Sequence, residues 1–233
     1  MSDCEACLVR NRAICSALAP DELAALSKLG RKQMVSRGQT LVWEGDEALV
    51  VANVIQGVLK LSVSTADGRE QIVGVVFPSD FIGRPFGKES PYGVTALTDA
   101  EVCIFTRAAF DGFAQGHPEL QHKLLQRTLD ELDRARQWMM LLGRKTASER
   151  IATLLLEISN RLGSSSCAGF LPYLDEFDLP MDRQQMGDVL GLTIETVSRQ
   201  LTKLKDAGMI ELPDRRRVVI KERHRLEQLA DAA

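Results

Sequence analysis

The amino-acid sequence predicts an α+β protein in three successive parts: an antiparallel β-roll of the jelly-roll type, a long dimerisation helix and a C-terminal winged helix-turn-helix. Glycines recur between short Val-, Ile- and Leu-rich runs over residues 32–105, which is typical of an antiparallel jelly roll. A long helix is predicted next, over about residues 117–142, and its residues 125–142 carry a seam of mostly apolar side chains at helical spacing. Two capping-box patterns and a turn glycine lie beyond residue 144. With 233 residues the chain suits two modest domains better than one.

The N-terminus predicts a protein that stays in the cytoplasm. The first fifteen residues contain no apolar segment of the kind found in secretory signals, and no apolar run in the chain reaches the length of a membrane span. Structural disulfides are not expected in a reducing compartment, and the odd number of five cysteines also disfavours a disulfide framework. We therefore expect no membrane partner, and the clustered cysteines need another explanation.

Four of the cysteines form a candidate ligand set. Cys4, Cys7 and Cys15 have the spacing C-x2-C-x7-C, and Cys103 lies in the last predicted strand of the β-roll. Thiolates suit either zinc or an iron–sulfur cluster, and spacing alone leaves that choice open. Taken alone, Cys103 is more typical of a buried apolar residue, whereas Cys167 lies in a Gly/Ser-rich loop and is interpreted as a bystander thiol.

The elements before the long helix can be placed in order. Pro20 begins a short helix that ends near Gly30, after a cysteine arm over residues 1–19. Within 58–64, Leu59, Leu61 and Val63 alternate with Lys60, Ser62 and Ser64, which predicts a half-buried strand with these three polar residues on its solvent face. Asp67-Gly68 then predicts a hairpin turn with a return strand over 71–77. The domain limits expected from these patterns are 1–19, 20–116, 117–143 and 144–233.

The long helix carries the signature of a helix that packs on a copy of itself. Its apolar seam has the spacing 3, 4, 3, 4, 3, as in a coiled coil. The predicted seam residues are Leu125, Thr128, Leu132, Ala135, Met139 and Leu142. Glu131 and Arg136 occupy flanking positions that meet across a parallel pair. The alternative is an amphipathic helix packed on its own domain, because the seam is shorter than three heptads.

The C-terminal part predicts a DNA-reading element. Asp182 caps a short helix, Gly191 makes the turn, Thr193 caps a second helix, and residues 210–211 and 218–220 are expected to form a two-stranded wing. The segment from Thr196 to Arg225 contains nine Lys or Arg but only four Asp or Glu, so it is basic within a chain that is acidic as a whole. We therefore expect this segment to bind an anionic partner, and nucleic acid is the first candidate.

The second helix offers residues for both base and phosphate contacts. Arg199 can bind guanine bidentately, Glu195 can accept a hydrogen bond from cytosine, and Ile194 can contact a thymine methyl. Ser198 completes this face. The candidate phosphate contacts are Thr193, Gln200, Lys203, Arg215, Arg216 and Arg217. A structural helical hairpin with a salt-bridged surface is the alternative interpretation.

At this point the sequence resembles the CRP/FNR family of bacterial transcription regulators. The resemblance runs through the β-roll glycines, the long helix, R-K-T-A-S-E-R-I at 144–151 and M-G-D-V-L-G-L-T-I-E-T-V-S-R at 186–199. The E-T-V-S-R run is similar to the recognition helix of the FNR branch, and this implies binding to TTGAT-type inverted repeats. It implies base contacts by Glu195, Ser198 and Arg199. The x7 gap between Cys7 and Cys15 resembles the FnrN/FnrL subgroup of oxygen sensors.

The resemblance implies how the protein senses and acts. The four cysteines would hold an oxygen-labile [4Fe–4S] cluster, which favours a homodimer on palindromic double-stranded DNA and control of anaerobic or microaerobic metabolism. The dimer would contact RNA polymerase through β-roll loops, with residues 84–88 as a candidate. The sensor domain would be cyclic-nucleotide-binding-like in fold. Residues 81–94, however, lack the family's Gly-Glu turn and phosphate-binding Arg, so no cyclic nucleotide is expected.

Two alternatives remain open from the sequence. One keeps DNA binding but makes the cysteines a thiol, zinc or nitric-oxide switch. The other is an enzyme that uses cysteine or carboxylate chemistry. None of the three histidines, His117, His122 and His224, is paired with a nucleophile motif, so we do not expect an enzyme.

Overall fold

The computed structural model describes residues 4, 7–164 and 172–231, and it divides the chain into two compact units, Met1–Leu132 and Asp133–Ala233. The boundary lies inside the long helix α3 (Pro118–Arg144), which confirms the helix predicted over about 117–142 and extends it by two residues at its C-terminal end. Cys167 lies outside the described residues. Among the described residues, no helix is both long and apolar enough to cross a membrane.

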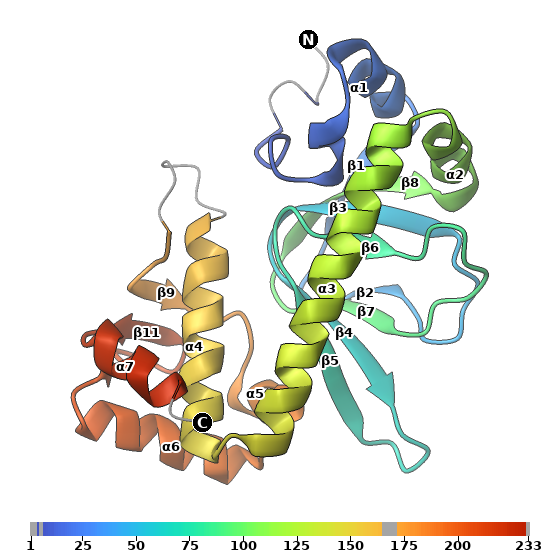
Figure 1. Cartoon of the computed structure of the whole chain (residues 1–233). Helices are drawn as coiled ribbons and strands as arrows, with labels where there is room; N and C mark the ends of the chain where they lie inside the picture. Colours follow the sequence, from blue (N-terminus) through green and yellow to red (C-terminus); the bar gives the residue numbers. More distant parts are fainter. Residues whose placement is uncertain (1–3, 5–6, 165–171, 232–233) are drawn as a thin grey trace. The chain divides into compact units, whose positions relative to one another are not determined.

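Unit 1 contains the predicted antiparallel roll. Two four-stranded sheets have the orders β1-β8-β3-β6 and β2-β7-β4-β5 (Figure 1). The strands are β1 (Gly30–Val35), β2 (Thr40–Val42), β3 (Val50–Gln56), β4 (Leu59–Ser64), β5 (Glu70–Val76), β6 (Phe81–Gly83), β7 (Gly93–Ala96) and β8 (Ala100–Thr106). Val54, Leu59, Val94 and Val102 are buried in one core with residues from both sheets. This arrangement is the double-sheet jelly roll that the glycine pattern predicts.

One strand departs from its predicted alternation. The hairpin turn at Asp67-Gly68 is confirmed, because Gly68 has φ +83° and its N–H donates to the Thr65 carbonyl. Lys60 and Ser62, predicted to face solvent, are both buried, each with 7% exposure. The prediction was wrong because Ile72 and Glu70 of β5 lie across from this face, and the Lys60 ammonium pairs with the Glu70 carboxylate. A buried Lys requires such a partner.

Helical segments cover the outer face of the β1-β8-β3-β6 sheet. They are a 3-10 helix η1 (Ile14–Ala17), α1 (Pro20–Ser27), α2 (Arg107–Gln115) and the start of α3. One apolar cluster joins Ile14, Leu26, Phe110 and Leu120 to Phe105 of β8. The described part of the N-terminal arm is therefore packed against this sheet. Helix α2 was not predicted.

Unit 2 is the predicted winged helix-turn-helix, with one more strand than expected. Its helices are α4 (Ala147–Ser164), α5 (Arg183–Leu190), α6 (Ile194–Asp206) and α7 (Arg223–Ala230). Both capping boxes are confirmed, and Gly191 has φ +63°, a conformation that favours glycine. The wing has three strands, ordered β10 (Ile210–Glu211), β11 (Arg217–Ile220) and β9 (Glu176–Asp178). The two-stranded prediction missed β9, which has only Phe177 as a buried residue.

Arg150 ties the end of α3 to the helix-turn-helix within unit 2. Its guanidinium donates to the carbonyls of Leu142 at 2.7 Å, Lys145 at 2.9 Å and Leu190 at 2.9 Å. These carbonyls lie at the ends of α3 and α5, where backbone acceptors have no helical partner. One side chain thus fixes α5 to the C-terminal turn of α3.

Candidate metal centre and nucleic-acid interface

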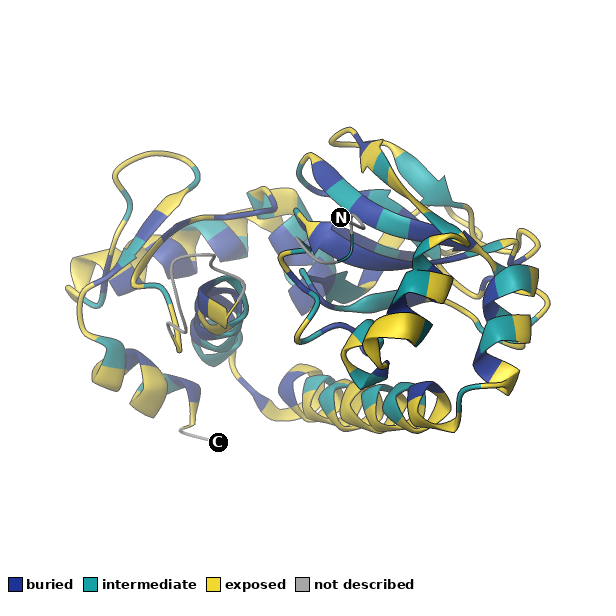
Figure 2. Ribbon diagram, turned by 90° about the horizontal axis from the view of Figure 1, so that it is seen from above, coloured by how far each residue is buried: buried dark blue, intermediate teal, exposed yellow. Residues whose placement is uncertain are grey.

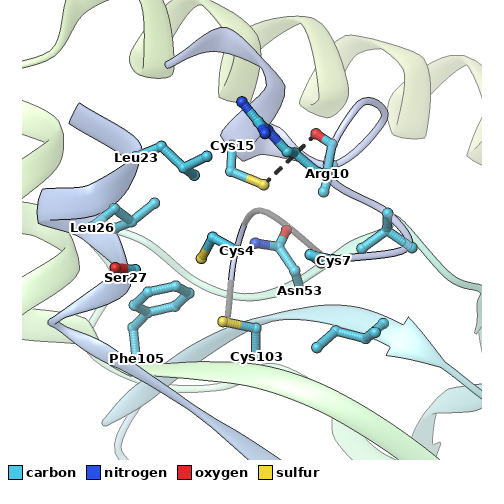
Figure 3. Close-up of a pocket in the computed structure, with 13 residues that line it drawn as sticks. Cys4, Cys7, Arg10, Cys15, Leu23, Leu26, Ser27, Asn53, Cys103 and Phe105 are labelled. Carbon is cyan, nitrogen blue, oxygen red and sulfur yellow. Dashed lines mark hydrogen bonds between the residues drawn. The ribbon is translucent and has the colours of Figure 1, made fainter. Parts of the chain in front are cut away.

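The four predicted ligand cysteines line one pocket between the arm and the sheet. Cys4, Cys7 and Cys15 come from the arm and Cys103 comes from β8, as Figure 3 shows. Apolar residues make most of the remaining wall, including Leu23 and Leu26 of α1, Ile55 of β3 and Phe105 of β8. The fold therefore brings together residues that are separated by almost ninety positions in the sequence.

Strand register explains why Cys103 faces the arm. Side chains alternate along a strand, so Cys103 and Phe105 lie on one face of β8 while Val102 and Ile104 point into the roll core. Directly across from Cys103 lie Lys32 of β1 and Asn53 of β3. Directly opposed residues in antiparallel strands share a face. A cation, a thiol and a carboxamide therefore form one row across this sheet.

The electrostatics of the pocket reflect four crowded thiols. Burial, with further contributions from Cys7 and Cys4, raises the pKa of Cys15 to about 11. Burial, together with Cys4, Cys7 and Cys15, raises the pKa of Cys103 to about 12, and Lys32 opposes this shift. Thiolates that share one buried pocket repel one another, so ionising all of them requires a cation among them.

The thiols share the pocket without forming a finished coordination shell. Among the described residues, no three or more His, Cys, Asp or Glu side chains are grouped closely enough to hold a metal ion. The Cys15 thiol instead donates to the Arg10 carbonyl at 3.9 Å. The donor set nonetheless fits an iron–sulfur cluster or zinc, because four soft sulfur ligands converge on a mostly apolar pocket.

The arm also contacts helix α3. The Arg127 guanidinium, on α3, donates a hydrogen bond to the carbonyl of Arg12, which lies between Cys7 and Cys15. Both residues belong to unit 1. No sequence motif indicated this contact. It links the segment that carries three of the thiols directly to the predicted dimerisation helix.

Much of α3 is exposed in the single chain. Among the predicted seam residues, Leu125, Leu132 and Met139 are 56%, 45% and 73% exposed, and Figure 2 shows the long helix largely in the exposed colour. Leu129 and Met140 extend this apolar surface beyond the predicted set. The remaining seam residues Thr128, Ala135 and Leu142 are exposed as well. A contiguous exposed apolar stripe of this kind makes this face of α3 a candidate interaction surface.

One of the two flanking charges has an ion-pair partner within its own chain. Arg136 forms an ion pair with Asp133 within α3, at 3.1 Å. Arg136 therefore already has a partner one turn away on its own helix, and pairing with Glu131 of a second chain must compete with it. Exposed pairs of this type contribute little, about 0–1 kcal/mol.

Helix α6 presents its N-terminal residues as predicted for a DNA-reading helix. Ile194, Glu195 and Arg199 are exposed, and Ser198 is half-buried. The Thr193 hydroxyl caps the helix by accepting from the Thr196 N–H at 3.2 Å. Hydrogen bonds from its own backbone N–H and from the Thr193 hydroxyl lower the pKa of Glu195. Glu195 is therefore an ionised acceptor, which suits the amino group of cytosine.

The candidate phosphate contacts divide into three groups. Lys203 and Arg215 are exposed. Arg217 is engaged by Glu176 at 3.3 Å and Asp178 at 3.4 Å, while the Asp214 carboxylate organises the wing turn by accepting from the backbone N–H groups of Arg216 and Arg217. The prediction for Gln200 was wrong, because its side chain is only 8% exposed. It lies one turn after the buried Val197 and one turn before the buried Leu204, on the inward face of α6. It does not present its amide to a phosphate.

Two family models match this chain over its two units. Residues 32–117 match the model described as "Cyclic nucleotide-binding domain", and residues 149–229 match "Crp-like helix-turn-helix domain". The two matches cover most of the roll and the C-terminal unit.

Individual relatives agree with these models. The chain is 44% identical over 223 residues to the transcriptional activator protein FnrL of Cereibacter sphaeroides, which covers 96% of this chain and 90% of FnrL. It is 34% identical to the transcriptional activator protein anr of Pseudomonas aeruginosa, covering 82% of this chain and 76% of that protein. The solved structure of FixK2 from Bradyrhizobium japonicum superposes with TM-score 0.79 at 34% identity, covering 88% of this chain and 98% of FixK2.

Proposed function

The chain belongs to the CRP/FNR family of transcription regulators, and we propose that it is an activator whose DNA binding responds to oxygen through a [4Fe–4S] cluster. The observation that carries the proposal is the single pocket lined by Cys4, Cys7, Cys15 and Cys103. The family membership makes the protein a helix-turn-helix regulator and not an enzyme. The similarity to FnrL supports an activating role.

In this proposal, the four thiolates hold the cluster, which when bound supplies an oxygen-labile cross-link between the arm and β8. The arm then keeps its packed position, in which Arg127 of α3 donates to the Arg12 carbonyl. Loss of the cross-link loosens the arm and weakens the support that it gives α3. If the two α3 helices pair only weakly, a change of a few kcal/mol in the free energy of packing at one end is enough to shift the monomer–dimer equilibrium.

The proposal assigns dimerisation to the exposed seam of α3 and DNA reading to α6. Two chains paired along the seam place two recognition helices about one helical turn of DNA apart, which matches an inverted repeat. Arg150 supports this transmission because it fastens the end of α3 to the end of α5 in unit 2. The proposed domain limits remain 1–19, 20–116, 117–143 and 144–233.

No cyclic nucleotide is included in this function. The loop between β6 and β7 offers few cations, namely Arg84 and Lys88. The Asp111 carboxylate accepts a hydrogen bond from the Phe86 N–H of this loop at 3.3 Å, which places an anion beside it. We propose that RNA polymerase is contacted by β-roll loops, with residues 84–88 as the candidate segment.

Anaerobic purification tests the cofactor directly. We expect iron, acid-labile sulfide and the broad visible absorption of an iron–sulfur chromophore, and we expect exposure to air to bleach it. Sedimentation before and after air should show the dimer fraction falling together with the absorption. A colourless protein that carries stoichiometric zinc contradicts the proposal, as does a cluster that is lost without any change in dimerisation.

Replacing Arg199 tests the proposed reading of bases. Arg199→Ala should weaken binding to the specific inverted repeat by about 1–3 kcal/mol and relax discrimination at one base pair, because one bidentate contact to guanine is lost. Binding to a panel of single-base variants of the site measures both effects. Arg215→Ala is the control, for which we expect a similar loss on every sequence and a smaller salt dependence. Equal losses on all sequences for Arg199→Ala assign it to phosphate instead.

A further inference from the structure

Asn53 is a buried polar residue that the protein leaves without a complete set of hydrogen bonds. It lies in the middle of β3, is 3% exposed and lines the cysteine pocket. Its Oδ1 atom has no hydrogen-bond partner among the described residues. A buried carboxamide oxygen without a partner is destabilising, and such groups are rare in folded proteins. This position therefore needs an explanation beyond packing.

The strand register aims Asn53 at the thiols. Asn53 pairs directly with Cys103 across β3 and β8, so the two side chains share the face that the arm covers. Ala52 and Val54, its neighbours along β3, point into the roll core instead. Figure 3 shows the Asn53 carboxamide among Cys4, Cys7 and Cys103.

The other polar groups near Cys103 are less suited to act on it. Lys32, on the opposite side of Cys103, has a side chain 41% exposed and is paired with Glu101 at 3.8 Å. Water therefore screens its charge. Ser27 also lines the pocket, but its hydroxyl donates to the Ala24 carbonyl within α1. Asn53 is thus the buried side chain whose amide is directed at the sulfur site.

We propose that Asn53 donates a hydrogen bond from its amide to the Cys103 sulfur when that sulfur is a metal-bound thiolate, and that this bond sets how long the centre survives in oxygen. The inference rests on the proposed function. A thiol can donate to the unpartnered Oδ1 atom, whereas a thiolate, which has no proton, can only accept from the two N–H donors of the same carboxamide. Asn53 can therefore serve Cys103 in either state, through different atoms. Hydrogen bonds to ligand sulfurs tune the reduction potential of iron–sulfur centres.

The direction of the effect follows from charge. A donor hydrogen bond withdraws electron density from the sulfur and stabilises the more negative, reduced state. With a metal centre bound to the thiolates, the oxidation concerned would be the transfer of one electron from that centre to dioxygen, which would become superoxide, with no proton or covalent bond transferred. Without the hydrogen bond this electron is lost more easily. The reduction potential should fall and the absorption should bleach faster in air.

The test compares Asn53→Leu, Asn53→Thr and the unaltered protein after anaerobic purification. Asn53→Leu keeps the approximate shape of the side chain without polar atoms, and we expect the same iron content with bleaching about 2- to 10-fold faster, the factor that corresponds to one hydrogen bond. Asn53→Thr keeps a donor hydroxyl and should bleach more slowly than Asn53→Leu. Ser90→Ala removes another buried polar side chain, one outside the pocket, and should leave the bleaching rate unchanged.

The melting temperature of the metal-free protein separates function from packing. Because the Asn53 oxygen has no partner, Asn53→Leu should not lower this temperature, and a lowered value would overturn the proposal by showing that Asn53 serves the fold. Equal bleaching rates in a loaded unaltered protein and in Asn53→Leu also overturn the role of Asn53 but leave the cluster intact. An unaltered protein without iron and sulfide overturns the proposed function itself, and the inference falls with it.

Discussion

Replacing Cys103 or Cys15 with Ser should reduce anaerobic binding to the specific inverted repeat to the level of non-specific DNA. Non-specific binding is typically about 10³- to 10⁷-fold weaker than specific binding, so this is the largest effect expected from any single substitution in the chain. Serine has nearly the same shape but is a poor ligand for iron, so the arm loses its link to β8. Iron content and binding to a labelled site, both measured without oxygen, check this expectation.

Two controls make the cysteine experiment decisive. Cys167→Ser should leave iron content and DNA binding unchanged, because Cys167 lies in a Gly/Ser-rich stretch of the sequence, far from the other four cysteines. If Cys167→Ser were as damaging as Cys103→Ser, the ligand assignment would be wrong. The melting temperature of each metal-free variant should stay close to that of the unaltered protein, so that a loss of binding reports the missing ligand instead of unfolding.

Local signals in the sequence were sufficient for most of the fold. The caps at Thr146 and Asp182, the turn glycine Gly191 and the hairpin at Asp67-Gly68 act over four residues or fewer, and each is confirmed. Such signals can be recognised in isolation because their physical cause is local: a helix end needs a hydrogen-bond partner, and a tight turn needs a left-handed residue.

The missed features depend on contacts between distant segments. Lys60 was expected in solvent because alternation alone cannot show what lies opposite on β5. Strand β9 contains three residues and exists because β11 pairs with it. Gln200 appeared on an exposed face, but the packing of α6 buries it.

For the candidate pocket, too, the local pattern could be predicted from the sequence and the contacts between distant segments could not. The cysteine spacing indicated a ligand set, whereas the placement of Cys103 opposite Asn53 required the register of β3 and β8. One signal for Asn53 was present: it is a single polar residue within the apolar run Val50–Ile55. Its partner across the sheet, and the hydrogen bond between Arg127 and Arg12, become visible only once the chain is folded.

A charge placed in the seam of α3 should have the second-largest effect. Leu132 lies near the middle of the exposed apolar stripe and on its own chain is 45% exposed. Leu132→Glu removes one apolar contact from each chain and sets two like charges against each other. Because each Leu132 is already partly covered by its own chain, pairing buries only the remaining exposed share, which for two leucines is about 1.5–3 kcal/mol, or roughly 10- to 10²-fold in dimerisation, and the repulsion between the two added charges weakens the dimer further. Anaerobic sedimentation over a range of protein concentrations measures this change.

Gln137→Glu is the matched control for this substitution. Gln137 is exposed on the same helix at a position outside the seam, so the same added charge should leave the dimer almost unchanged. Leu132→Glu should also keep its iron and its visible absorption, because the cysteine pocket does not include Leu132. We therefore expect a monomer that carries its iron but does not bind the inverted repeat. If Leu132→Glu instead dimerised as tightly as Gln137→Glu, pairing along this face of α3 would be excluded, and the exposed stripe would belong to a different partner.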